Sequence, residues 1–233
     1  MSSPPTPAPR RRLIDLSRVI EHGMITDPRL PTPVVRDVWT REQSASRYAP
    51  GVSFQIASVE LVQNTGTYLD APFHRHEGME GVWDIGLERL ADLSGVCVDA
   101  RSRVDAGERA MGPETFSGVD VRGRAVLLCT GFDARWDDAA YRDGSHPHLT
   151  EAGARALVEG GATLFGIDAI NADAFDALAR PAHSLLLGAG APIVENLVGL
   201  DALVGRAFHF TAAPARIKGL GSFPVRAYAA MED

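Results

Sequence analysis

Short hydrophobic runs separated by glycine-rich breaks recur along the 233-residue chain and predict more strands than helices. Residues 53–62 contain alternating apolar and polar positions, which predicts a strand that leads into the turn at 64–74. Further strands are expected where Val, Leu, Ile or Phe dominate a run, at 95–100, 124–130, 163–168, 207–211 and 225–229. Most of these strands follow one another directly, so the pattern does not indicate a regular βαβ alternation.

Three segments have helical character. The clearest helix begins at Thr150, whose hydroxyl suits an N-cap, and ends at the glycine pair 160–161. A second, alanine-rich helix is expected over residues 173–178, ending before Pro181, and a short third one over 200–204. The strands therefore dominate, and we expect an α/β protein built on a mixed sheet.

The composition is that of a globular protein with an ample core, because 45% of its residues are hydrophobic. Residues 1–12 are rich in proline and end in three arginines, so we expect a flexible N-terminal tail there. No linker divides residues 13–233, which favours a single domain. Polar residues interrupt the run after the arginines, so it does not resemble a secretion signal, and no apolar run is long enough to span a bilayer.

The charge of the chain points to small molecules rather than polyanions as partners. The formal net charge is −7 and the isoelectric point is about 5.5, so neither nucleic acid nor an anionic membrane is an expected partner. Cys97 and Cys129 each lie in an apolar, strand-like run. We interpret them as buried free thiols, which is consistent with a reducing cytoplasm.

The most chemically informative segment is 64–74, which contains a carboxylate at Asp70 and an imidazole at His74. Pro72 lies between them and argues against a helix, so a turn after a strand is the expected structure. Gly66 allows a close backbone approach at the start of the segment. Polar side chains that face one pocket in this way are suited to holding a metal and a proton carrier.

This segment resembles the signature of the cyclase family of metal-dependent hydrolases, which includes bacterial kynurenine formamidases and isatin hydrolases. The family pattern reads His-x-Gly-Thr-His-x-Asp-x-Pro-x-His. Asn64 and Tyr68 stand where the family has its first two histidines. The positions that match the pattern are Gly66, Thr67, Asp70, Pro72 and His74.

The resemblance extends over nearly the whole chain. Residues 13–17 with 22–24 resemble the family's opening strand and first loop, and residues 125–132 resemble its central strand. His183 is followed by Glu195 at the family interval, within a Glu-Asn-Leu stretch. The resemblance implies the β/β/α, swivelling-domain-like cyclase fold, in which a mixed sheet packs with helices around a barrel-like core.

The resemblance also implies a set of metal ligands, namely Asp70, His183 and Glu195. Two carboxylates and one neutral imidazole suit Mn²⁺, Zn²⁺ or Fe²⁺. Because the two early histidines are replaced, we expect one divalent ion, Mn²⁺ or Zn²⁺. His74 matches the family's general acid/base, and an imidazole with an ordinary pKa of about 6.5 suits that role. Without the resemblance, ordinary structural roles would explain these ligands: Asp70 would cap a turn, His183 would pack in the core and Glu195 would form an ion pair.

Two interpretations of the replaced histidines remain open. Asn64 and Tyr68 either bind substrate by hydrogen bonding or stacking, or they mark a loss of catalysis. As a metal ligand, Tyr68 would have to ionise, which its ordinary pKa of about 10 makes costly. His76 has no match in the pattern and is expected only as a pocket residue, and His146-Pro147-His148 is expected to be a surface loop.

Together these features predict a metal-dependent hydrolase that acts on an amide, lactam or ester carbonyl of a small cyclic or aromatic substrate. The alternative is a metal-free cyclase or isomerase, or a non-catalytic small-molecule-binding member of the same family. The resemblance also implies self-association as a homodimer or homotetramer.

Overall fold

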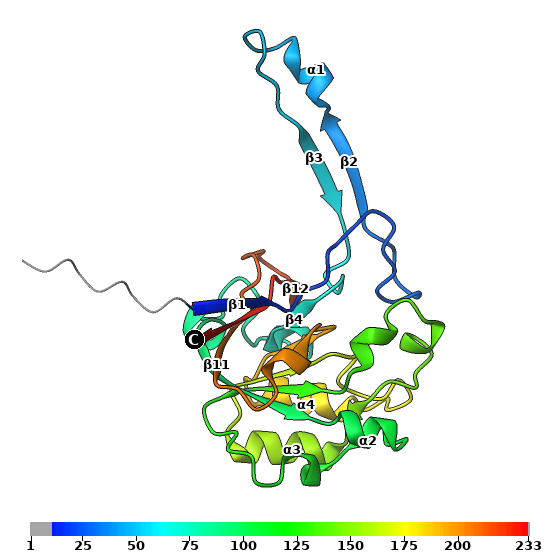
Figure 1. The fold of residues 1–233 in the computed structure, drawn as a ribbon, viewed down its shortest axis with the longest axis vertical. Helices are drawn as coiled ribbons and strands as arrows, with labels where there is room; N and C mark the ends of the chain where they lie inside the picture. Colours follow the sequence, from blue (N-terminus) through cyan, green and yellow to red (C-terminus); the bar gives the residue numbers. More distant parts are fainter. Residues whose placement is uncertain (1–10, 233) are drawn as a thin grey trace, which may run out of the picture.

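The computed structural model describes residues 11–232, which form a curled, nine-stranded mixed sheet with helices packed on it and a long projecting arm (Figure 1). The strand order is β1-β13-β11-β5-β7-β9-β10-β4-β12. This curled mixed sheet confirms the predicted fold class. The strands are β1 Arg11–Asp15, β4 Tyr68–Asp70, β5 Leu93–Asp99, β7 Ala125–Cys129, β9 Leu164–Ile167, β10 Ile193–Glu195, β11 Phe208–Thr211, β12 Ser222–Pro224 and β13 Tyr228–Glu232.

The centre of the sheet is parallel, and its two sides are antiparallel. Strands β5, β7, β9 and β10 pair in parallel, whereas β4 and β12 on one side and β11, β13 and β1 on the other pair antiparallel. Each parallel crossover contains a helix, namely α2 Arg101–Asp105, α3 Glu151–Gly160 or α4 Pro181–Gly188. The expectation that βαβ alternation is lacking is therefore wrong for this part of the chain, as parallel neighbours require such crossovers.

The first predicted helix is confirmed and the second is wrong. In α3, the Thr150 hydroxyl accepts a hydrogen bond from the Gly153 amide, and Gly161 ends the helix with a φ of 82°. Residues 173–178 form turns instead of a helix. The helix begins only at Pro181, because the Asp173 carboxylate accepts the Ala182 and His183 amides and so caps α4. The third prediction, 200–204, corresponds to a short 3₁₀ helix, η6 Leu200–Leu203.

The predicted strands of the sheet agree with β5, β7, β9 and β11, and the last strand begins three residues later than predicted, at Tyr228. The signature segment contains a strand, β4, where the sequence predicts only a turn. Within the sheet, Asp70 pairs with Ile193 of β10 on one side and with Ser222 of β12 on the other. The remaining short elements are η1 Pro72–His74, η2 Leu87–Arg89, η3 Pro113–Phe116, η4 Phe132–Arg135, η5 Ala139–Tyr141, β6 Ala110–Met111 and β8 His148–Leu149.

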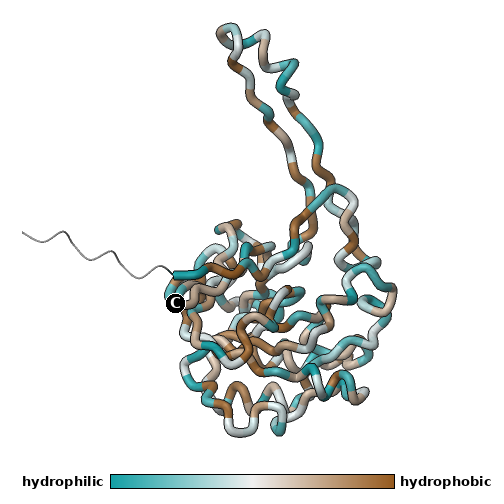
Figure 2. The backbone as a smooth tube through the Cα atoms, viewed as in Figure 1, coloured by the Kyte–Doolittle hydropathy of each residue, from teal (hydrophilic) through white to brown (hydrophobic). Residues whose placement is uncertain are grey.

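The alternating segment 53–62 contains β3 Ile56–Glu60, which lies in the projecting arm rather than in the main sheet. The arm consists of β2 Val34–Trp39, α1 Arg41–Ala45 and β3, and it extends from the body on the side away from α2 and α3 (Figure 1). Short hydrophobic stretches alternate with hydrophilic ones along the arm (Figure 2). The predicted strand is therefore confirmed, and the exposed hydrophobic residues of this arm include Val35, Val38, Phe54, Ile56 and Val59.

The first and last strands of the described chain, β1 and β13, pair with each other at one edge of the sheet. Arg11 and Arg12 belong to β1 and pair with Glu232 and Met231, so the predicted tail 1–12 extends two residues too far. Its other residues, 1–10, lie outside the described part of the chain.

Cys129 is buried and Cys97 is half-buried, and both are free thiols. Within residues 11–232, no helix has the length and apolar character needed to cross a membrane.

Candidate active site

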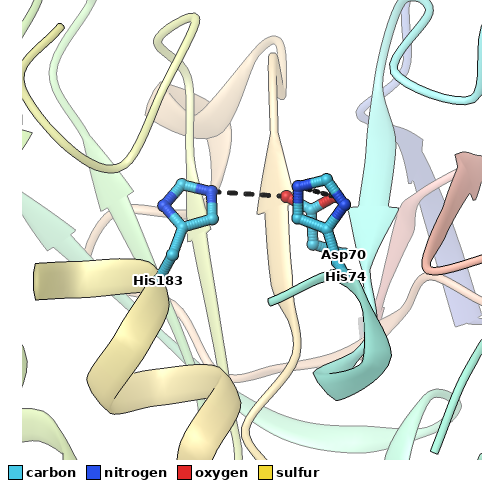
Figure 3. A group of neighbouring side chains, drawn as sticks. All are labelled: Asp70, His74 and His183. Carbon is cyan, nitrogen blue, oxygen red and sulfur yellow. Dashed lines mark ion pairs between the residues drawn. The ribbon is translucent and has the colours of Figure 1, made fainter. Parts of the chain in front are cut away.

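Four residues that the sequence singles out converge where β4, β10, η1 and the start of α4 meet. Figure 3 shows three of them, Asp70, His74 and His183. Asp70 and Glu195 come from neighbouring antiparallel strands, and His183 comes from the first turn of α4. The His183 Nε2 atom lies 3.5 Å from Asp70 Oδ2 and 3.5 Å from Glu195 Oε1. His74 faces them from η1, with its Nε2 3.8 Å from Asp70 Oδ1.

The ring of His183 is oriented by Asp173, a residue whose role the sequence did not reveal. The Asp173 carboxylate lies 2.6 Å from His183 Nδ1 and also accepts the His183 amide at 3.1 Å. With Nδ1 engaged in this way, Nε2 is directed towards Asp70 and Glu195. Burial lowers the pKa of His183, but the hydrogen bond to Asp173 and the nearby carboxylates of Asp70 and Glu195 raise it to about 10. The position between the carboxylates therefore favours positive charge.

The ring of His74 is oriented by Ser222, another residue that the sequence did not reveal. The Ser222 hydroxyl donates its hydrogen to Asp70 Oδ1, so the oxygen accepts from His74 Nδ1, which lies 2.8 Å away. The neutral ring therefore carries its hydrogen on Nδ1 and leaves Nε2 free as a base. Gly221 is essential to this arrangement, because a Cβ at that position would lie 2.5 Å from the His74 Cα.

Tyr68 and Asn64 donate hydrogen bonds to the two carboxylates. The Tyr68 hydroxyl donates to Glu195 Oε2, and Asn64 Nδ2 lies 3.4 Å from Asp70 Oδ1. Burial, together with the charges of Glu195 and Asp70, raises the pKa of Tyr68 well above its ordinary value. Tyr68 therefore keeps its proton and acts as a donor. Burial also raises the pKa of Glu195 to about 7, against the lowering effect of His183.

One buried oxygen in this cluster is unpaired. Asp70 Oδ2 has no hydrogen-bond partner among the described residues, although Asp70 is completely buried. An unpaired buried carboxylate oxygen is costly unless a cation compensates it. Burial raises the pKa of Asp70, but His74, His183 and Ser222 lower it, and the net shift is downwards. Asp70 is therefore available as an anionic ligand.

The surrounding donors fit a divalent cation. Ligand atoms of Asp70, His74 and His183 all lie within 4.8 Å of one another. Glu195 is outside this tightest group, but its Oε1 lies 3.5 Å from His183 Nε2 and accepts the Ala172 amide at 2.7 Å. Carboxylate oxygens and imidazole nitrogens are suitable donors for Mn²⁺ or Zn²⁺. His74 is close enough to serve either as a ligand or as a base.

A cavity of about 190 Å³ opens beside these groups, and Asn64, Tyr68, Asp70, His74 and His183 all line it. It is smaller than the range of about 300–1,000 Å³ that is usual for drug-sized ligands, so it suits a small molecule. A larger cavity of about 730 Å³ lies elsewhere, between β5, β11 and β13. That larger cavity contains none of the predicted site residues.

Two other predicted histidines lie away from this cavity wall. His76 Nε2 lies 3.0 Å from the Ser184 carbonyl oxygen of α4, and His76 is not among the residues that line the cavity. The prediction of a surface loop for His146-Pro147-His148 is wrong, because His146 is completely buried. Its Nε2 lies 2.9 Å from the Asp173 carbonyl oxygen, so it packs beneath the segment that leads to α4.

Comparisons with known proteins identify the family of the chain. The family model described as "Putative cyclase" matches residues 14–174. A kynurenine formamidase from Salinibacter ruber is 31% identical over 216 residues, which cover 92% of this chain and 95% of the relative.

Two solved structures share the fold. Isatin hydrolase A from Ralstonia solanacearum superposes with a TM-score of 0.80 at 24% identity, over 95% of this chain and 92% of its own. A structure described as a potential metal-dependent hydrolase with cyclase activity superposes with a TM-score of 0.75 at 22% identity, over 96% of this chain and 100% of its own. From the family match and the curated relative, we conclude that this chain belongs to the cyclase family.

Proposed function

We propose that this protein is a metal-dependent hydrolase that cleaves the carbonyl–nitrogen bond of an amide or lactam, or the corresponding ester bond, in a small cyclic or aromatic substrate. The observation that carries the proposal is the buried, unpaired Oδ2 of Asp70 facing His183 Nε2. The similarity to a kynurenine formamidase and to an isatin hydrolase supports the reaction class. The unpaired oxygen also favours this proposal over a metal-free cyclase, isomerase or binding protein.

The cofactor in this proposal is one divalent ion, Mn²⁺ or Zn²⁺, held by Asp70, His183 and Glu195. When bound, such an ion polarises a substrate carbonyl and makes water a stronger acid. A single ion is favoured because Tyr68 and Asn64 direct hydrogen atoms towards Glu195 Oε2 and Asp70 Oδ1. Those oxygens are thereby satisfied by donors from the chain itself.

The proposed proton carrier is His74. Its Nε2 accepts a proton from the attacking water and then delivers it to the departing nitrogen or oxygen. Ser222 keeps the ring in the tautomer in which this nitrogen is free. Tyr68 and Asn64 line the same cavity and are placed to contact the substrate as well as the carboxylates.

The proposal also includes a cytoplasmic location and self-association of the chain. Two free cysteines without a disulfide are consistent with a cytoplasmic protein. The projecting arm leaves a cross-strand pair, Val35 and Val59, exposed to solvent. Because an isolated two-stranded hairpin is only marginally stable in water, we propose that a second copy of the chain covers this arm.

Metal removal tests the proposed function. Protein stripped with a chelator and reloaded with Mn²⁺ or Zn²⁺ is expected to bind one ion per chain, measured by elemental analysis. A panel of formanilides, lactams and aryl esters should be hydrolysed by the loaded protein only. Full activity after stripping would support the metal-free alternative, and two ions per chain would contradict the single site.

Replacement of His74 tests its role. His74→Ala is expected to lower kcat by about 10²–10⁴-fold, the usual contribution of a positioned acid/base, with an unchanged metal content. His209→Ala, which changes a partly exposed histidine on β11, serves as the control. Loss of the ion from His74→Ala would show instead that His74 is a ligand, and normal rates would remove it from the mechanism.

Replacement of Asp173 tests the orientation of His183. Asp173→Asn is expected to weaken metal affinity by about 10–100-fold, because the anionic acceptor at His183 Nδ1 is lost. Competition with a metal-binding dye measures this affinity. The matched control is Asp176→Asn, an exposed aspartate in the same segment. Equal affinities for the two variants would contradict the proposed role of Asp173.

Substitutions in the arm test self-association. The double variant Val35→Lys with Val59→Glu keeps a favourable cross-strand pair but removes the apolar surface. Light scattering after size exclusion should shift from a multiple of the 24.9 kDa chain to the monomer. Leu87→Lys, an exposed apolar position on the body, is the control and should not shift. A monomeric wild type, or an unchanged double variant, would contradict the proposed arm interface.

A further inference from the structure

Arg180 is a charged residue of the catalytic cavity that the proposed mechanism leaves unused. It lines the cavity together with His183 and occupies the N-cap position of α4, three residues before that histidine. Its backbone lies in the left-handed region, with φ 48° and ψ 59°, which is uncommon for a residue other than glycine. The guanidinium is tethered to the wall, because Nη1 lies 3.3 Å from both Asn171 Oδ1 and the Ala174 carbonyl oxygen.

The charge of Arg180 is not neutralised by an acidic neighbour. None of the ion pairs within residues 11–232 includes it. The other arginine of the cavity, Arg29, differs in this respect. The Asp27 carboxylate accepts hydrogen bonds from Arg29 Nε at 2.9 Å and Nη2 at 2.6 Å, and the Arg29 guanidinium lies over the Phe175 ring. Arg180 is thus the cavity arginine with an uncompensated charge.

The acidic groups of the cavity are engaged elsewhere. Asp70 is oriented towards Ser222 and His183, and Glu195 accepts from Tyr68 and Ala172. The half-buried Arg180 guanidinium makes its hydrogen bonds to the described residues through Nη1, so its Nε and Nη2 remain available as donors for an anion. The N–H donors of a guanidinium lie in one plane, so they match the two oxygens of a planar carboxylate better than a single-atom anion.

We propose that Arg180 binds a carboxylate of the substrate, so that the preferred substrate is an amide or lactam carrying a second, anionic group beside the scissile bond. This inference rests on the proposed hydrolase function and specifies its substrate class. Arg180 and His183 are fixed by the same end of α4, so the anion and the scissile carbonyl are positioned by one rigid element. Arg180 is then a specificity residue, distinct from the groups that carry out the reaction.

Steady-state kinetics test this assignment with two formanilides that differ only in one ring substituent, a carboxylate or a neutral carboxamide. The wild type should prefer the carboxylate. Arg180→Gln should raise KM for the carboxylate by about 10–100-fold, the range expected for one charge-assisted hydrogen bond, and leave the carboxamide unchanged. Arg180→Lys, which keeps the charge but not the fork, should lie in between. Arg122→Gln, an exposed arginine outside the cavity, is the control for the change in net charge.

Direct binding separates failure of this inference from failure of the proposed function. Calorimetric titration of metal-loaded protein with benzoate should show binding that Arg180→Gln loses while its metal content stays the same. If no formanilide is hydrolysed, the hydrolase proposal fails, and benzoate binding still decides the role of Arg180. Equal benzoate affinity in wild type and Arg180→Gln, absence of binding to the wild type, or equal use of both formanilides by the wild type would overturn the inference.

Discussion

The carboxylate of Asp70 is the group on which the whole site depends, because the sheet holds it between two neighbouring strands. Antiparallel pairing places β10 on one side of β4 and β12 on the other, so Glu195 and Ser222 approach from opposite directions. Ser222 satisfies Oδ1, while Oδ2 is buried without a partner and faces His183. The fold therefore places in the wall of a small cavity a buried carboxylate oxygen that has no hydrogen-bond donor among the described residues and that faces only the His183 imidazole. A buried carboxylate is tolerated only where a cation compensates its charge or a proton neutralises it.

The fold class and the residues that converge could be predicted because several motifs that resemble the cyclase family occur in the expected order along the chain. Asp70, His183 and Glu195 are far apart in the chain, yet His183 Nε2 lies 3.5 Å from an oxygen of each carboxylate. The residues that orient them were missed for a different reason. Ser222 acts on Asp70 from 152 positions away, and no local pattern marks a serine for such a contact. Asp173 was missed for the same reason, because it reaches the amides of Ala182 and His183 from 9 and 10 positions away, whereas the N-cap position of α4 is Arg180.

The incorrect helix prediction at 173–178 shows local preference outweighed by tertiary contacts, and the strand at 53–62 shows what periodicity leaves unspecified. The alanine-rich segment 173–178 has the composition of a helix, but its first carboxylate is used to cap α4 instead. The alternating segment 53–62 does form a strand, β3, yet alternation alone does not specify what covers the apolar face. In the described chain that face lies on an arm that projects from the body (Figure 1). Periodicity indicates the element, and its surroundings come only from the assembled fold.

Tyr68 and Asn64 determine which carboxylate oxygens of the site already receive a hydrogen bond from the chain itself. An imidazole at either position would direct a lone pair into the site, whereas the phenol and the amide direct hydrogen atoms there. Burial and the nearby carboxylates raise the pKa of Tyr68, so its hydroxyl remains a donor to Glu195 at neutral pH. Each hydrogen bond satisfies an oxygen that would otherwise need a positive charge. The two hydrogen bonds therefore agree with the single cation of the proposed function, and they leave free the side of the cluster that faces His183.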